Sequence, residues 1–139
     1  MERPYEYFDV TADVGFHAYG SDINEAFENA ALAMFNVITN TDDVDDQKTY
    51  DFSLQSEDNI SLLFDFLEEL LFLHEVEFML FSNFNVAIDE DLNLKATVKG
   101  ENINWEKHER GSEVKAITFH KMDVDQSKDL CKVQVILDL

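Results

Sequence analysis

The spacing of apolar residues in the first third of the chain predicts one amphipathic helix. Over residues 22–39 the apolar side chains recur at i, i+3 and i+4, with charged and polar side chains off that face. Asp22 and Glu25 have the spacing of a capping box, and Ser21 is a competing cap. The cap at its start and the polar stretch at residues 39–47 bound this helix.

A second helical pattern follows a cap expected at Ser56. Its apolar stripe is widened by further large residues, so that it covers well over a third of the circumference: Leu62, Phe66, Phe72 and Leu73. Such a helix is typical of a central core element, and we expect Phe72 to be buried with the rest. We expect it to end within residues 74–80, where the apolar residues Phe78, Met79, Leu80 and Phe81 hide the exact boundary.

Alternating and β-branched segments predict the strands. They lie at 5–10, 14–19, 50–55, 84–88, 92–98, 114–119 and 130–138. Strand and helix alternate first and a run of strands follows, which indicates an α+β fold. We expect one domain over residues 1–139, with two helices packed on one face of a mixed β-sheet as a two-layer sandwich.

Composition narrows the classes of partner. The chain has 139 residues, 45% of them hydrophobic, and a formal net charge of -20. This length and apolar content allow a real core. Because phosphate-backbone affinity comes from Lys and Arg, direct nucleic-acid binding is not expected, whereas cations and basic protein surfaces are favoured. With no long apolar run and no signal-peptide pattern at the N-terminus, no membrane association is expected and the expected location is cytoplasmic.

Most motifs that would identify an enzyme are missing from the sequence. There is no glycine-rich phosphate loop, nucleophile elbow or paired Cys-x-x-Cys, and the four histidines are scattered. The single Cys131 stands in an apolar strand and is expected to be a buried small hydrophobe. The acidic segment 42–46 lacks the glycine and the closing glutamate of an EF-hand.

One stretch stands out, Asp9-Val10-Thr11-Ala12-Asp13-Val14-Gly15-Phe16-His17. Asp13 between two apolar runs is by itself a turn residue, and Gly15 allows a bend or a close approach. At the other end, the last strand stops at Asp138 and the terminal carboxylate of Leu139. If the first and last strands are neighbours, these three residues bring carboxyl groups together.

A second candidate lies in the segment Glu113-Val114-Lys115-Ala116-Ile117-Thr118-Phe119-His120. Lys115 is expected on the strand face opposite to Ala116. A salt bridge to the acidic surface and a functional contact are equally compatible with this position. His120 in the same segment is by itself more typical of an ordinary surface histidine.

Several of these segments together resemble the archease family. The resemblance rests on Tyr7-Phe8-Asp9-Val10-Thr11-Ala12-Asp13-Val14-Gly15, on residues 26–35 and 67–73, on Gly111-Ser112-Glu113-Val114-Lys115-Ala116-Ile117-Thr118-Phe119-His120, and on the closing Val135-Ile136-Leu137-Asp138-Leu139. It runs in order over nearly the whole chain. One departure is Val10, because the family usually has His before Thr-Ala-Asp.

The resemblance implies an accessory protein of the RNA-splicing ligase that joins 3'-phosphate and 5'-hydroxyl RNA ends. Members promote the GTP-dependent guanylylation of that ligase and its multiple turnover. The family also binds a divalent cation, commonly calcium, and the resemblance implies Asp13, Asp138 and Leu139 as its ligands here. Lys115 and His120 are candidate contacts to the partner. Two carboxylates, a terminal carboxyl group and water suit the irregular oxygen coordination of calcium.

Two other classes of function remain open from the sequence. A metal-dependent phosphoester hydrolase would use the same carboxylates as a free-standing enzyme, but no nucleophile or paired histidine supports it. A general acidic chaperone or scaffold would use the acidic surface and exposed phenylalanines, independently of Asp13.

Overall fold

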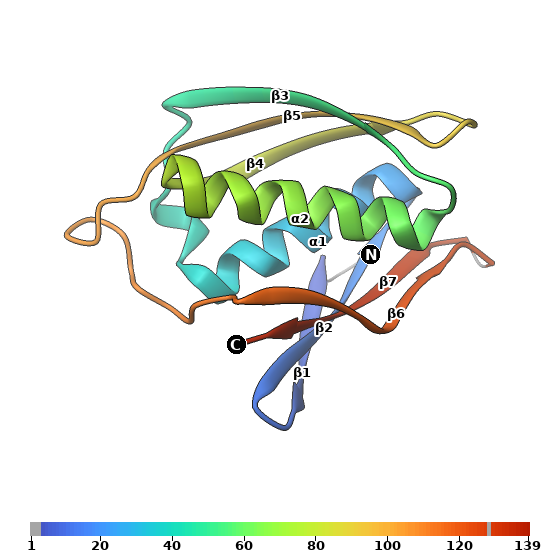
Figure 1. Cartoon of the computed structure of the whole chain (residues 1–139), viewed down its shortest axis with the longest axis horizontal. Coiled ribbons are helices and arrows are strands. Elements are labelled where there is room, and N and C mark those ends of the chain that lie inside the picture. The colour runs from blue at the N-terminus through green and yellow to red at the C-terminus, as the bar shows by residue number, and fades with distance from the viewer. Residues whose placement is uncertain (1–3, 128) are drawn as a thin grey trace.

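The computed structural model describes residues 4–127 and 129–139 (Figure 1), and its elements follow the predicted order. They are β1 (Tyr5–Val10), β2 (Asp13–Gly20), α1 (Ile23–Ile38), the short 3-10 helix η1 (Thr41–Asp43), β3 (Lys48–Gln55), α2 (Asn59–Glu77), β4 (Met79–Ile88), β5 (Asn93–Asn102), β6 (Ala116–Asp125) and β7 (Cys131–Asp138). The α+β class is thereby confirmed.

The strands form two antiparallel sheets where one mixed sheet was expected. The four-stranded sheet has the order β1-β2-β7-β6 and the three-stranded sheet the order β3-β5-β4. Figure 1 shows α1 and α2 between the two sheets, with α2 in front of α1. The physical reason is that both helices have wide apolar surfaces, so each can bury side chains against a sheet on either side.

The four-stranded sheet directs alternate residues of β2 and β7 toward the helices. Phe16 and Ala18 of β2 and Val133, Val135 and Leu137 of β7 are all buried. Because side chains alternate along a strand, the intervening residues lie on the outer face of this sheet. The register therefore decides which polar side chains are presented to solvent.

Helix α1 begins as the sequence predicts. The Asp22 carboxylate accepts a hydrogen bond from the Glu25 backbone N–H at 2.8 Å, and the Glu25 side chain accepts one from the Ser21 N–H at 2.8 Å. The bond to Asp22 satisfies one donor that the first helical turn leaves without a partner, and the bond from Ser21 fastens the residue before the cap to the helix. The competing cap at Ser21 is not used.

Helix α2 begins later than predicted, whereas its end at Glu77 lies within the predicted segment 74–80. Its N-cap is Asp58, whose side chain accepts from the Ser61 N–H at 2.7 Å. Ser56 stands too far upstream and donates instead to the Asp65 carboxylate at 2.6 Å. At the other end Phe78 forms a left-handed C-cap with φ 57°. The expectation that Phe72 is buried was wrong, since its side chain is 54% exposed.

Cys131 is buried and unpaired, as predicted. Burial and the nearby carboxylates of Asp125 and Asp22 raise the pKa of its thiol to about 11. Among the described residues, neither helix has the length and apolar character needed to cross a bilayer.

Candidate functional site

Asp13 and Asp138 lie directly opposite each other on neighbouring strands. Asp13 opens β2, Asp138 closes β7, and the two residues are register partners in the antiparallel ladder. Directly opposite residues place their Cβ atoms about 4.5–5.5 Å apart on the same face of a sheet. The expected meeting of the two ends of the chain is therefore present.

This pair suits a cation on the outer face of the sheet. Asp13 is partly exposed and Asp138 exposed, so both carboxylates keep access to water and ions. Like charges placed directly across a ladder repel each other, and a bound cation would relieve that repulsion. Calcium accepts carboxylate, carbonyl and water oxygens in irregular geometry, which fits this donor set.

The described residues contain no group of three or more His, Cys, Asp or Glu side chains placed to hold a metal ion. A cation at Asp13 and Asp138 would therefore need further oxygen donors. Leu139 follows β7 directly and is partly exposed, and it is the residue expected from the resemblance to supply one of them. Water would supply the rest.

Gly15 allows an aromatic ring to cover the strand beside Asp13. A Cβ atom at Gly15 would lie 2.3 Å from two ring carbons of Phe8, a separation that real side chains do not tolerate. Phe8 and Gly15 are register partners on β1 and β2. The close approach allowed by this glycine is therefore to the Phe8 ring, which packs on the outer face next to the Asp13 position.

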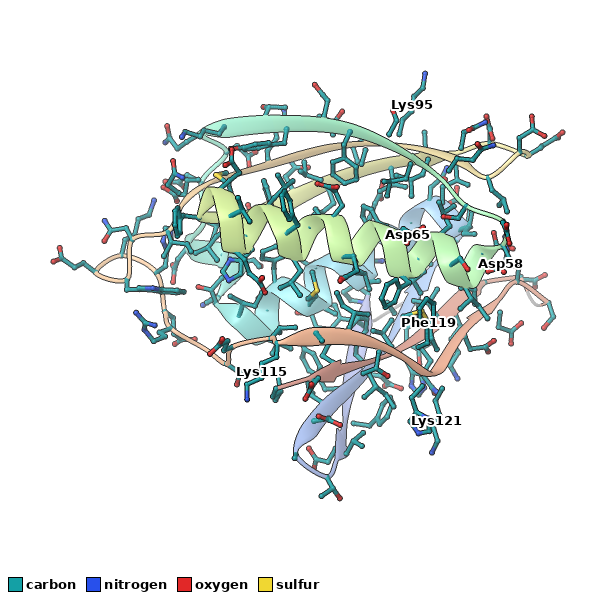
Figure 2. The ribbon with its side chains drawn as sticks, viewed as in Figure 1. Asp58, Asp65, Lys95, Lys115, Phe119 and Lys121 are labelled. Atoms are coloured by element: carbon teal, nitrogen blue, oxygen red, sulfur yellow. The ribbon has the colours of Figure 1, made fainter. Side chains whose placement is uncertain are left out.

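Lys115 lies at the same end of the sheet. Its backbone N–H donates to the Asp138 carbonyl at 2.8 Å, and the next residue, Ala116, is the register partner of Asp138. Figure 2 shows the Lys115 side chain beside the end of β7, pointing away from α2. Among the described residues no carboxylate forms a salt bridge with Lys115, so its ammonium group stays available to a partner.

The segment that leads to Lys115 is fastened to the end of α1. The backbone N–H groups of Gly111 and Ser112 donate to the carbonyls of Ile38 and Val37, each at 2.8 Å. A Cβ atom at Gly111 would lie 2.4 Å from the Val37 carbonyl oxygen. Only glycine allows this contact, which uses two carbonyls that the helix end leaves unpaired.

A charged network holds the other end of the same segment. Glu101 accepts from the Asp45 N–H at 2.7 Å, from Lys107 Nζ at 2.7 Å and from His108 Nε2 at 3.1 Å. Burial opposes ionisation of Glu101, but these hydrogen bonds outweigh it and lower its pKa to about 2. Since the Asn104 N–H donates to Nδ1 of His108, the proton of this buried imidazole is on Nε2.

The structure does not bring His120 to this end of the sheet. The β6–β7 register shifts between Thr118 and Asp123, and His120 lies in this irregular part, exposed, with its N–H bonded to Thr118 Oγ1 at 2.8 Å. Val10, in contrast, is the register partner of Asp13. The position where the family usually has His is therefore next to the candidate cation site. In this chain that position carries the apolar side chain of Val10.

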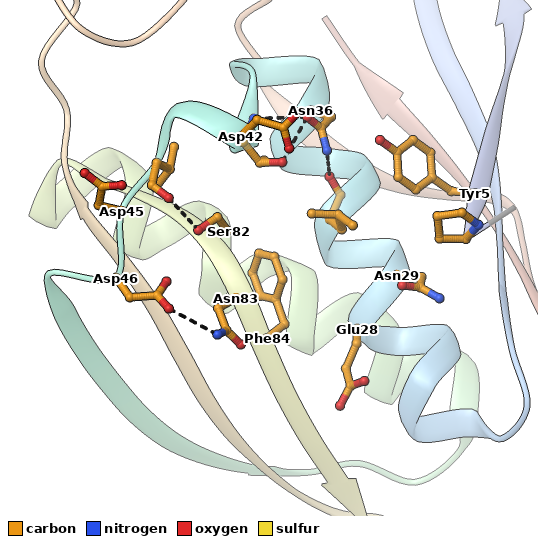
Figure 3. A pocket seen from close by; sticks show the side chains of 14 residues that line it. Tyr5, Glu28, Asn29, Asn36, Asp42, Asp45, Asp46, Ser82, Asn83 and Phe84 are labelled. Carbon is orange, nitrogen blue, oxygen red and sulfur yellow. Dashed lines mark hydrogen bonds between the residues drawn. The ribbon is translucent and has the colours of Figure 1, made fainter.

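A groove of about 980 Å³ lies elsewhere, between α1, η1 and β4 (Figure 3). Its polar side chains bond to neighbouring backbone: Glu28 accepts from the Val86 N–H at 2.8 Å and Asn36 from the Thr41 N–H at 3.1 Å. Burial raises the pKa of the Glu28 carboxyl, against the opposing effect of the Val86 bond. Asp13, Asp138 and Lys115 do not line this groove, and its hydrogen bonds join α1 to β4 and η1.

Sequence reasoning missed the residues that position Lys115. Nothing in the local pattern showed that Gly111 contacts α1 or that Glu101 binds Lys107 and His108, because these partners lie on different elements. Gly111, three residues before the predicted strand 114–119, was the one available signal for a close contact.

Comparison of the sequence with known proteins identifies related proteins of one family. A model of the archease protein family matches residues 5–139. The chain is 54% identical over 140 residues to a protein archease of Methanothermobacter thermautotrophicus, with 99% of each chain covered. It is 42% identical over 132 residues to a protein archease of Pyrococcus abyssi, covering 93% of this chain and 92% of that one.

Two solved structures have the same fold. The solution structure of a Methanobacterium thermoautotrophicum protein superimposes with a TM-score of 0.87 at 54% identity, covering 98% of this chain and 99% of that one. A Thermotoga maritima crystal structure, described as an archease and possible chaperone, gives a TM-score of 0.66 at 22% identity, covering 100% and 98%. At that identity the second structure supports the fold alone.

Proposed function

This chain belongs to the archease family, and we propose that it acts as a non-catalytic accessory protein of the RNA-splicing ligase, in the cytoplasm. In this proposal it promotes the GTP-dependent guanylylation of the ligase and so supports multiple turnover. It acts through protein contact, because its net charge of -20 disfavours binding to RNA phosphates.

The observation that carries the proposal is the Asp13–Asp138 pair with Lys115 beside it. Asp13, Asp138 and Leu139 would hold a divalent cation, with calcium as the expected ion. When bound, the cation would supply positive charge to phosphate oxygens near it. The chain's own residues position this site. The β2–β7 ladder sets the separation of the carboxylates, and Lys115, which has no salt bridge to any described residue, offers its ammonium group to a phosphate or carboxylate.

A guanylylation assay tests this proposal. The cognate ligase is incubated with GTP and a divalent metal, with and without the chain, and covalent GMP is measured over time. Asp13→Asn and Asp138→Asn keep the side-chain shape and remove one charge each, and we expect both to lower the stimulation at least tenfold. Asp123→Asn, on exposed β6 away from this site, is the matched control.

Full stimulation by both folded variants would contradict the proposal. Lys115→Ala is expected to weaken stimulation as well, whereas Lys95→Ala on β5 is expected to leave it unchanged. Turnover of a phosphoester by the purified chain alone would favour the metal-dependent hydrolase.

A general chaperone activity is the second candidate. It is supported by the exposed large apolar side chains on α2 and β6. This function predicts that the chain suppresses aggregation of unrelated proteins and that Asp13→Asn has no effect on that suppression.

A further inference from the structure

The outer face of α2 exposes large apolar side chains at its C-terminal end. Phe72 is 54% exposed, Val76 one turn later is 50% exposed, and Phe78 at the C-cap is 63% exposed. In Figure 1 no element covers the near side of α2. We refer to Phe72, Val76 and Phe78 as the α2 apolar surface. Clustered exposure of this kind is typical of an interaction site, whereas single exposed apolar residues are not.

Acidic side chains surround this surface. They are Asp65 (Figure 2), Glu68, Glu69, Glu75 and Glu77, all at least partly exposed. Glu68, Glu69 and Glu75 stand three or four positions from Phe72, so they are its neighbours on the helix. Within the described part of the chain, no Lys or Arg forms a salt bridge with any of these five carboxylates.

Several features of this arrangement are unfavourable in the free chain. Asp65 has like charges at i+3 and i+4 in Glu68 and Glu69, which repel along the helix. Glu75 and Glu77 stand at the negative end of the helix dipole, where a basic residue would be favoured. Phe78 adopts φ 57°, a left-handed conformation that glycine or asparagine would adopt with less strain. Its side chain is not buried in return.

A surface with an apolar centre and a basic rim would satisfy all of these groups at once. A second copy of this chain is a poor occupant, because each copy has a net charge of -20. Nucleic acid would bring further negative charge to a face rimmed by carboxylates. A protein that binds RNA, in contrast, exposes Lys and Arg for the phosphates.

We propose that the α2 apolar surface and its acidic rim dock on the Lys- and Arg-rich surface of the RNA ligase. This inference rests on the proposed function for the identity of the partner, and it assigns a contact separate from the Asp13–Asp138 site. The apolar side chains supply buried area at the centre of the contact, and the acidic rim sets orientation and speeds association.

Paired variants of α2 test this docking surface. Phe72→Ser/Val76→Ser removes apolar area from an exposed helix face, and Glu68→Lys/Glu75→Lys reverses two rim charges. Leu130→Ser, at a residue 42% exposed before β7, is the control for exposed apolar area. Glu90→Lys/Asp91→Lys in the exposed β4–β5 turn is the control for charge. Thermal unfolding and calcium-induced stabilisation verify that each variant is folded.

The measurement is the dissociation constant for the purified ligase by titration calorimetry at low and at raised salt. We expect both α2 variants to weaken binding about tenfold or more at low salt. The charge variant should also flatten the salt dependence. Both controls should bind within about twofold of the wild-type chain.

The outcomes separate this inference from the proposed function. If Asp13→Asn abolishes stimulation while folded α2 variants bind as tightly as wild type, the proposed function stands and the docking inference is overturned. If the wild-type chain does not bind the ligase, both are overturned. If the wild-type chain self-associates and Phe72→Ser/Val76→Ser makes it monomeric, the surface belongs to a second copy and the inference is wrong.

Discussion

Asp13 faces Asp138 across the β2–β7 ladder, so two carboxylates from opposite ends of the chain share one position at the end of the four-stranded sheet. Like charges directly opposite each other repel, and in the proposed function a bound cation relieves that repulsion. Calcium should therefore raise the melting temperature by several degrees. At about a hundredfold excess over its dissociation constant a ligand that binds only the folded state adds about 2.7 kcal/mol.

Differential scanning calorimetry with calcium and with a chelator measures this effect. Asp13→Asn should abolish the shift, and Asp123→Asn should retain it. If calcium raised the melting temperature of Asp13→Asn as much as that of the wild-type chain, the ion would bind at another site.

Gly15 is predicted to be intolerant of even one methyl group. Gly15→Ala places a Cβ atom 2.3 Å from the Phe8 ring and should lower the free energy of unfolding by about 1–3 kcal/mol. Urea unfolding measures the change. In the Phe8→Ala background the ring is gone, so the cost of Gly15→Ala should nearly vanish. An undiminished cost in that background would mean that the ring is not the obstacle.

Gly111→Ala should lower both the stability of the chain and its stimulation of the ligase. The added Cβ meets the Val37 carbonyl oxygen at 2.4 Å, so the segment before Lys115 must move away from α1. We expect a loss of stability of about 1–3 kcal/mol and, in conditions where the variant is folded, weaker stimulation of guanylylation. Wild-type stimulation by the folded variant would show that the position of Lys115 does not depend on this anchor.

The ionised Glu101 carboxylate should make the stability of the fold sensitive to acid. Its pKa is lowered from 4.5 to about 2, so its contribution to stability is complete above about pH 4.5 and is lost as the pH falls toward 2. With allowance for solvent screening, the contribution is on the order of 1–2 kcal/mol.

Urea unfolding between pH 7 and pH 3 tests this sign with Glu101→Gln. The variant should be less stable at pH 7, and the difference from wild type should shrink at low pH. Glu90→Gln, at an exposed turn residue, is the control. A difference that grows at low pH would contradict the assignment.

Cys131 should be unreactive in the folded protein. Its thiol is buried and its pKa is raised to about 11, so little thiolate forms at pH 8. A thiol-specific reagent such as a chromogenic disulfide should react slowly with native protein and stoichiometrically in guanidinium chloride. Fast reaction under native conditions would show that the β7 strand opens readily.

The sequence by itself determined the order and type of the two helices and seven strands among the described residues, and it named the candidate site residues. Local spacing located α1 and its capping box, the strand containing Cys131, and the Asp13 and Asp138 positions at strand ends. These features depend on residues close together in the chain, where helical and strand periodicity are directly visible.

Only the tertiary structure decided how these elements meet. The division into two antiparallel sheets, the exposure of Phe72 and the placement of His120 away from the Asp13–Asp138 pair all depend on contacts between distant elements. The apolar pattern of α2 cannot show which side of the helix lacks a neighbour. The anchor at Gly111 depends likewise on a carbonyl of α1, because close packing between separate segments has no local signature in the sequence.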